Sequence, residues 1–168
     1  MAMLLFFCTG IAFAETSDDF ALLKIKLRQT FPEVVSLSVE EFKQELRSNP
    51  SKIVIIDSRA REEYEVSHLD GAVLFEPKVD SLKSLVEKLP MDKAIITYCS
   101  VGYRSSKLAE QLMAKGFSNV RSLEGGIFEW ANHNNAVFSG SKQVKYVHPF
   151  NKAWGRFLNN DLHPPAFQ

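Results

Sequence analysis

The stretch AIITYCSVGYR, residues 94–104, decides the fold of this 168-residue chain. It opens with a continuous apolar and β-branched run, which is typical of a strand that is covered on both faces. Residues 105–115 then carry apolar side chains at helical spacing, and Gly116 follows them as a helix-ending glycine. The sequence therefore predicts a buried strand that delivers Cys99 to a turn, with a helix starting directly after that turn.

This position has a chemical consequence for Cys99. The first N–H groups of a helix have no intrahelical partner, and the helix dipole places partial positive charge there. Gly102 allows the turn to direct N–H groups toward an anion, and Arg104 adds a permanent cation. These features favour the thiolate of Cys99, so we predict that it is a nucleophile rather than a cysteine that only fills space.

Strands and helices alternate along most of the chain. Apolar runs predict strands at residues 34–37, 53–56, 72–75, 94–98 and 117–123. Helices are predicted at residues 18–31, 38–49, 79–89, 105–115 and 127–133, with a helical turn at residues 61–67. The helix at 38–49 is marked by a capping box at Ser38 and Glu41, and the one at 79–89 by apolar residues at helical spacing. This order predicts an α/β fold with a central, mostly parallel sheet of about five strands and helices on both faces. Ligands of such sheets bind beyond the carboxyl ends of the strands, where Asp57 and Cys99 lie.

The N-terminal segment, residues 1–14, has the pattern of a secretory signal peptide. It carries no charged side chain and ends in Ala12-Phe13-Ala14, so we expect cleavage after Ala14 and a periplasmic or secreted protein. The segment is shorter than the roughly 20 apolar residues of a bilayer span, so no stable membrane span is expected. Because no Lys or Arg precedes the apolar run, an uncleaved membrane anchor or a cytoplasmic protein remains the alternative. Cleavage would remove Cys8 and leave Cys99 as the sole thiol.

Charge and histidine spacing restrict the partners. The 20 basic and 20 acidic side chains cancel, which argues against a nucleic-acid partner. The four histidines, at positions 68, 133, 148 and 163, show no pairing at metal-ligand spacing, so no metal site is expected.

Three separated segments carry a resemblance to a known family. They are Asp57-Ser58-Arg59 with Glu62 or Glu63, Tyr64, His68, Gly71 and Ala72; Cys99 through Ser105; and Gly125-Gly126-Ile127-Phe128-Glu129-Trp130. In their order and spacing they resemble the single-domain rhodanese-like sulfurtransferases. The resemblance covers residues 34–134, with a helical extension at 15–33 and a C-terminal extension at 135–168. The C-terminal extension is too aromatic for a disordered linker, so we expect it to pack on the domain and cover an edge or a helix pair. The alternative is that Trp154 or Phe157 roofs the Cys99 pocket and limits donor size.

The resemblance implies a mechanism that needs no cofactor. Cys99 would take a sulfane sulfur from a small-molecule donor such as thiosulfate or a persulfide and hold it as a persulfide. It would then pass the sulfur to cyanide or to a thiol, which a protein can also supply. The substrate-binding residues would be Arg104, for donor oxygens or the persulfide charge, and the loop residues Ser100, Val101, Gly102, Tyr103 and Ser105, through N–H groups. The resemblance further implies a structural ion pair between Asp57 and Arg59, and a turn-fastening hydrogen bond from His68.

Two alternatives differ in chemistry from this reading. Phosphatases and arsenate reductases of the same general fold place five residues between their Cys and Arg, whereas four separate Cys99 from Arg104 here, so we rank them lower. A rhodanese-like binding module, or a module that relays sulfur between proteins, belongs to another class. The presence of Cys99 favours chemistry over binding alone and leaves relay open. Ser100 replaces the arginine that often follows the cysteine in thiosulfate-using members, so thiosulfate is expected to be a poor donor.

Overall fold

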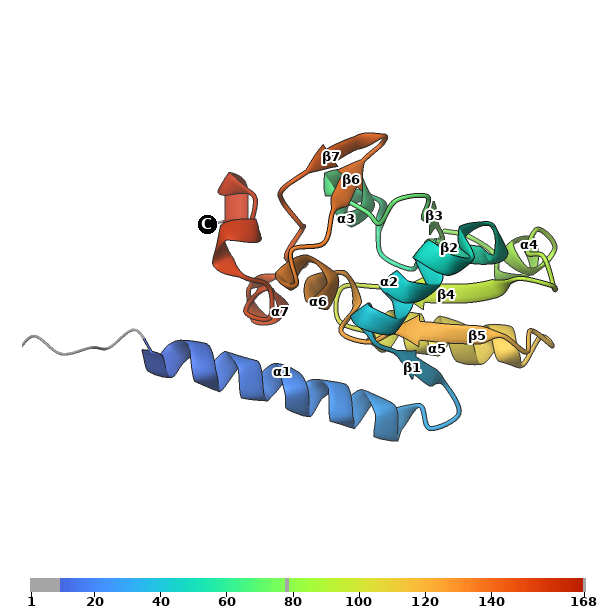
Figure 1. Ribbon diagram of the computed structural model, residues 1–168, viewed down its shortest axis with the longest axis horizontal. Coiled ribbons are helices and arrows are strands. Elements are labelled where there is room, and N and C mark those ends of the chain that lie inside the picture. The colour runs from blue at the N-terminus through green and yellow to red at the C-terminus, as the bar shows by residue number, and fades with distance from the viewer. Residues whose placement is uncertain (1–9, 78, 168) are drawn as a thin grey trace, which may run out of the picture.

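The computed structural model describes residues 10–77 and 79–167 and forms an α/β domain with additions at both ends (Figure 1). The strands are β1 (Val35–Leu37), β2 (Ile53–Asp57), β3 (Val73–Leu74), β4 (Ala94–Tyr98), β5 (Val120–Leu123), β6 (Val137–Ser139) and β7 (Lys142–Val144). The α-helices are α1 (Gly10–Thr30), α2 (Val39–Ser48), α3 (Arg61–Val66), α4 (Leu82–Val86), α5 (Tyr103–Met113), α6 (Gly126–Asn132) and α7 (Lys152–Gly155). Short 3-10 turns cover residues 50–52, 160–162 and 165–167.

The central sheet has five strands in the order β1-β5-β4-β2-β3, and all neighbouring strands are parallel. This confirms the predicted α/β fold with a five-stranded parallel sheet. The apolar runs of β2 and β4 form the middle of the sheet, where both faces are covered. Asp57 at the end of β2 lies beside Tyr98 at the end of β4, so Asp57 and Cys99 lie at the same edge of the sheet.

Helices cover both faces of the sheet because successive strand residues point to opposite sides. Ile96 of β4 belongs to the core that includes Phe42 of α2 and Ile127 of α6. Its neighbour Ile95 belongs to the other core, which includes Leu108 of α5.

Several element boundaries differ from the predicted ones, and the largest differences in the domain lie in α4, α5 and β5. Helix α5 begins at Tyr103 rather than at residue 105, because Gly102 adopts a left-handed conformation with φ of +118° and acts as its N-cap. Helix α4 ends at Val86 instead of residue 89. Strand β5 begins at Val120 rather than at residue 117, because the Phe117 N–H bonds back to Leu112 O and closes the end of α5.

Helix α1 is longer than the predicted helix at 18–31 and starts within the segment assigned to the signal peptide. Residues 1–9 of that segment, Cys8 among them, lie outside the described residues. No proline interrupts the sequence before Pro32, and the helix ends two residues before it. Within the described part of the chain, no helix has both the length and the apolar character needed to cross a membrane.

The C-terminal extension packs on the domain through a hairpin, helix α7 and buried apolar side chains. The β6–β7 hairpin was not predicted, and it joins the domain through paired backbone bonds between His68 and Phe138. Val147 and Leu158 are buried, and Phe157 stacks on Phe20 of α1 with 5.0 Å between ring centroids. Figure 1 shows α1 along one side of the domain, close to α7. The two extensions therefore meet each other on the outside of the domain.

Candidate active site

The Cys99 thiol lies at the end of β4, facing the start of α5. The Gly102 N–H donates to Cys99 Sγ at 3.2 Å, and Ser105 Oγ lies 3.8 Å from the same sulfur. Cys99 is a free thiol and only 2% exposed. The loop thus directs a backbone donor and the N-terminal end of α5 at the sulfur, an arrangement that stabilises negative charge there.

Helix α6 fixes the backbone of this loop from behind. The Ile127 N–H donates to Cys99 O at 2.9 Å, and the Phe128 N–H donates to Ser100 O at 3.1 Å. A Cβ at Gly126 would lie 2.2 Å from Cys99 O, so only glycine permits this approach. The glycine pair singled out in the sequence therefore holds the peptide groups next to Cys99 in place.

Arg104 lies near the sulfur and is paired with a buried carboxylate. Its guanidinium donates to both oxygens of Glu63, at 2.7 and 2.8 Å, and to Ser100 Oγ at 2.9 Å. Ser100 Oγ in turn donates to Glu63 Oε1 at 2.8 Å. The Phe150 ring covers the same guanidinium at 5.0 Å. Ser100 thus directs its hydroxyl at the Arg104–Glu63 pair.

Pairing sets the charge of both partners. Burial by itself raises the pKa of Glu63, but the hydrogen bonds and charge of Arg104 outweigh burial, and the pKa lies below its usual range. For Arg104, burial lowers the pKa, but Glu63 and the nearby Cys99 raise it above its ordinary value. Both groups therefore stay ionised, and the positive charge of Arg104 is largely balanced by Glu63.

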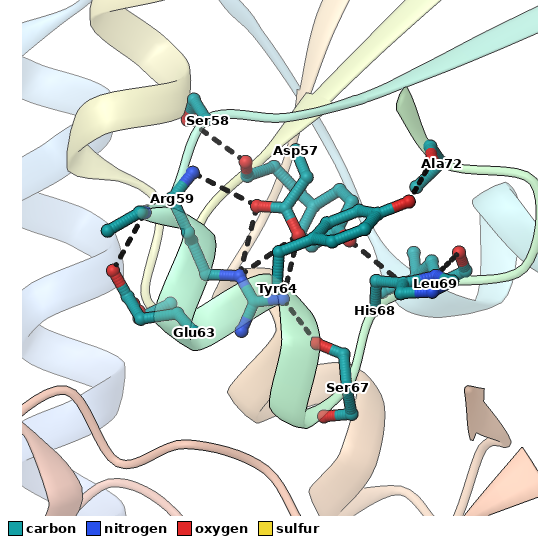
Figure 2. A network of polar contacts seen from close by, with 12 residues as sticks. Asp57, Ser58, Arg59, Glu63, Tyr64, Ser67, His68, Leu69 and Ala72 are labelled. Atoms are coloured by element: carbon teal, nitrogen blue, oxygen red, sulfur yellow. Dashed lines mark hydrogen bonds and ion pairs between the residues drawn. The ribbon is translucent and has the colours of Figure 1, made fainter. Parts of the chain in front are cut away.

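Asp57 and Arg59 form a fully buried ion pair at the neighbouring strand end (Figure 2). Arg59 donates to both Asp57 oxygens and to Ser67 O, while the Tyr98 hydroxyl donates to Asp57 Oδ2 at 2.5 Å. Burial and the charge of Asp57 raise the pKa of Tyr98 well above its ordinary value. This cluster joins β2 to β4 and α3, and neither Asp57 nor Arg59 lines the cavity at Cys99.

His68 lies in the turn after α3, as Figure 2 shows. Its ring stacks on Tyr64 at 4.2 Å, and Nδ1 lies 2.9 Å from Leu69 O. The Tyr64 hydroxyl donates to Ala72 O across the turn at 2.7 Å. His68 therefore fastens this turn and takes no part in the Cys99 loop. Among the side chains that the structure describes, no group of three or more His, Cys, Asp or Glu could hold a metal ion.

A cavity of about 470 Å³ opens onto Cys99. Its lining comprises Leu23, Lys26, Leu27 and Thr30 from α1; Cys99, Ser100, Val101, Tyr103 and Arg104 from the loop; and Phe150 and Trp154 from the C-terminal extension. Trp154 thus lines the pocket, in agreement with the alternative that an aromatic side chain of the C-terminal extension roofs it. Phe157 does not line it, because it is buried against Phe20.

Comparison with known proteins now identifies the domain that carries this loop. Residues 38–133, more than half of the chain, match the family model described as a rhodanese-like domain. The chain belongs to the rhodanese-like family. The resemblance seen in the three sequence segments is thereby confirmed.

Named relatives of this rhodanese-like chain differ in activity. A Staphylococcus saprophyticus tRNA uridine(34) hydroxylase is 41% identical over 96 residues, covering 54% of this chain and 29% of the relative. The Mycobacterium tuberculosis "Probable adenylyltransferase/sulfurtransferase MoeZ" is 35% identical over 80 residues, covering 48% and 20%. This chain thus spans well under half the length of these two relatives. A rhodanese-related protein from Thermoplasma volcanium, 23% identical, superposes with a TM-score of 0.54 over 62% of this chain and 98% of that one, which shows the shared fold.

The rhodanese-like domain supplies only part of the site. Two sets of lining residues lie outside the family match at residues 38–133: Leu23 and Leu27 before it, and Phe150 and Trp154 after it. These four side chains form the apolar walls of the cavity. Sequence reasoning did not find the wall residues of α1, nor Phe150, nor the pairing of Glu63 with Arg104. The i, i+4 spacing of Leu23 and Leu27 signals an apolar helix face, but not the surface that it covers.

Proposed function

We propose that this protein transfers a sulfane sulfur from a donor such as thiosulfate or a persulfide to a thiol or cyanide, through a persulfide on Cys99. The Cys99 thiolate attacks the outer sulfur of the donor, and a new S–S bond forms. With thiosulfate, the old S–S bond breaks and its electron pair leaves with sulfite. An acceptor thiolate or cyanide then attacks the outer sulfur of the persulfide and regenerates the Cys99 thiolate.

The observation that carries the proposal is the Gly102 N–H donating to Cys99 Sγ at the floor of an accessible cavity. A thiolate in this position has a donor aligned before the reaction, and the persulfide formed on it is also an anion. Membership of the rhodanese-like family supports the same chemistry. The two relatives' different names support a shared domain rather than one shared substrate.

Intact-protein mass spectrometry tests this function. The full chain is incubated with thiosulfate or with a low-molecular-weight persulfide, desalted and weighed beside Cys99→Ser. We expect the mass of one added sulfur atom on the wild-type chain, localised to Cys99, and no addition to the variant. An unchanged wild-type mass with both donors, or an equal addition to Cys99→Ser, would contradict the proposal.

A further inference from the structure

The cavity above Cys99 is walled by apolar side chains from outside the family domain. Leu23 and Leu27 of α1 form one side, and Phe150 and Trp154 form the other. Leu27 Cδ1 would lie 3.2 Å from a Cβ at Gly102, so α1 packs directly against the loop at residues 99–104. The cavity volume of about 470 Å³ lies within the range of sites for small organic ligands, roughly 300–1,000 Å³.

The charges at this cavity suit a small doubly charged anion poorly. Among the described residues that line it, Lys26 and Arg104 are cationic. Arg104 is already paired with Glu63 through two hydrogen bonds and covered by Phe150, and Lys26 belongs to an exposed part of α1. A dianion such as thiosulfate would lose water on entry without gaining an unpaired buried cation.

The burial of Cys99 also limits which donors can reach its thiol. Cys99 is 2% exposed at the cavity floor, and α1 and the C-terminal extension form the walls on either side. A donor must therefore carry its sulfur down to Cys99 while its body contacts the walls. A compact organic group can do so, whereas a rigid protein surface meets α1 and Trp154 first.

We propose that the sulfane donor is a small molecule with an apolar organic body, a thiosulfonate-like or persulfide monoanion, which the walls formed by Leu23, Leu27, Phe150 and Trp154 select over thiosulfate. This inference rests on the proposed sulfur transfer and names its donor class. The sulfur end meets the Gly102 N–H and Cys99, and the organic body is buried against the apolar walls.

Arenethiosulfonates are suitable probes because the transfer is balanced without any further reactant. The Cys99 thiolate attacks the terminal sulfur of benzenethiosulfonate, and the Cys99 persulfide forms. The sulfur–sulfur bond of the donor breaks, and benzenesulfinate leaves with its electron pair. Methanethiosulfonate undergoes the same reaction with the same charge but has only a methyl group as its body.

The experiment compares second-order rates of Cys99 persulfide formation from benzenethiosulfonate, methanethiosulfonate and thiosulfate, followed by intact mass. Each rate is divided by the rate of the same donor with 2-mercaptoethanol, which removes differences in intrinsic reactivity. We expect the aromatic donor to exceed the methyl donor by at least about tenfold, the low end of what an apolar pocket contributes for one added group. We expect thiosulfate to react more slowly than either.

Variants of the wall residues show whether the cavity walls cause the preference for the aromatic donor. Trp154→Ala and Leu23→Ala should each lower the aromatic-to-methyl ratio several-fold. Phe150→Ala provides a test at an exposed side chain, 44% accessible, where folding is least at risk. Ile25→Ala is the matched control, because Ile25 is an exposed aliphatic residue of the same helix that does not line the cavity. A change that only loosened the fold would lower the rates of all donors together.

The outcomes distinguish a failure of the inferred donor class from a failure of the proposed sulfur transfer. A high aromatic-to-methyl ratio that falls in the wall variants and not in Ile25→Ala supports the inference. Equal normalised rates for the three donors overturn it and leave sulfur transfer standing. An aromatic preference that survives in all three wall variants also overturns the inference, because the cavity walls would then not be the cause of the preference. A wild-type chain that none of the donors loads overturns both.

Discussion

The floor of the Cys99 cavity is held by hydrogen bonds and ion pairs, whereas its upper walls are held by apolar contacts. On the floor, Glu63, Arg104 and Ser100 bond to one another, and α6 fixes the loop backbone. The walls come from α1 and the C-terminal extension, which meet through the stacked rings of Phe20 and Phe157.

The difference separates two requirements of the proposed sulfur-transfer site. Directional bonds position the groups that act on the sulfur, where an error of about 1 Å costs about 100-fold in rate. Apolar surface is not directional and selects a ligand by size and hydrophobic character. Substitutions in the floor should therefore lower the rates with all donors or change the preference for donor charge. Substitutions in the walls should change the preference for the organic body of the donor.

The largest effect on stability is expected at the buried pair beneath the floor. Asp57→Asn leaves the Arg59 charge buried without its partner, which costs about 3–5 kcal/mol of unfolding free energy. Urea denaturation followed by circular dichroism measures the loss. The double variant Asp57→Leu with Arg59→Met removes both charges and should recover part of the stability, because the buried Tyr98 hydroxyl and Ser67 O still lose their hydrogen bonds. A loss below about 1 kcal/mol in Asp57→Asn, the value of an exposed pair, would contradict the structural role.

Gly126→Ala should disrupt the floor of the Cys99 cavity. The new Cβ would lie 2.2 Å from Cys99 O and displace the loop, so persulfide formation should fall about 100-fold with every donor. Gly140→Ala is the matched control, because its φ of +59° is close to the +58° of Gly126 but its Cβ would meet nothing within 4 Å. Equal losses in both variants would show that backbone strain, not contact with the loop, is responsible.

Glu63→Gln tests whether the carboxylate limits the use of dianions. With the balancing charge removed, Arg104 should attract thiosulfate more strongly, raising the rate ratio of thiosulfate to methanethiosulfonate by about tenfold, or about 1.4 kcal/mol. A ratio of rates cancels any general weakening of the loop. Glu62→Gln removes an exposed charge from the same helix and should leave the ratio unchanged. An unaltered ratio in Glu63→Gln would mean that the Glu63–Arg104 pairing does not set donor charge.

The smallest effect is a pH dependence of stability from the same carboxylate. The pKa of Glu63 in the folded protein lies below its ordinary value of 4.5, so ionised Glu63 stabilises the fold. This contribution is complete above pH 4.5 and is lost as the pH falls through the lowered folded value. The difference in unfolding free energy between wild type and Glu63→Gln should therefore be constant near neutrality and shrink in acid. A free-energy difference that grew on acidification would contradict a stabilising role of ionised Glu63.

The sequence was sufficient to predict the sheet and the position of Cys99 between β4 and α5. Buried parallel strands leave continuous apolar runs, as at residues 53–56 and 94–98, and the glycine pair at 125–126 marks a close backbone approach. The Glu63–Arg104 pair was not predicted, because a contact between residues 41 positions apart depends on tertiary structure. The β6–β7 hairpin was not predicted, because its strands of three residues each are too short to leave a clear alternating pattern.

The walls were the least predictable part of the site. The sequence offers both Trp154 and Phe157 as candidates for the roof, and nothing in their sequence neighbourhood separates the two. The structure separates them through Phe20, which stacks on Phe157 and buries it. Likewise, the apolar face of α1 shows that the helix packs on something, and only the fold shows that Leu27 packs on Gly102.

The most direct test of the central claim is the amount of transferable sulfur that the protein holds on Cys99. The full chain is loaded with benzenethiosulfonate, freed of donor by gel filtration and mixed with cyanide, and the thiocyanate released is measured. Cyanide attack on the Cys99 persulfide gives thiocyanate and the free thiolate, so we predict thiocyanate stoichiometric with wild-type protein and none from Cys99→Ser. Loaded wild-type protein that releases no thiocyanate, or a Cys99→Ser variant that releases as much, would contradict the account.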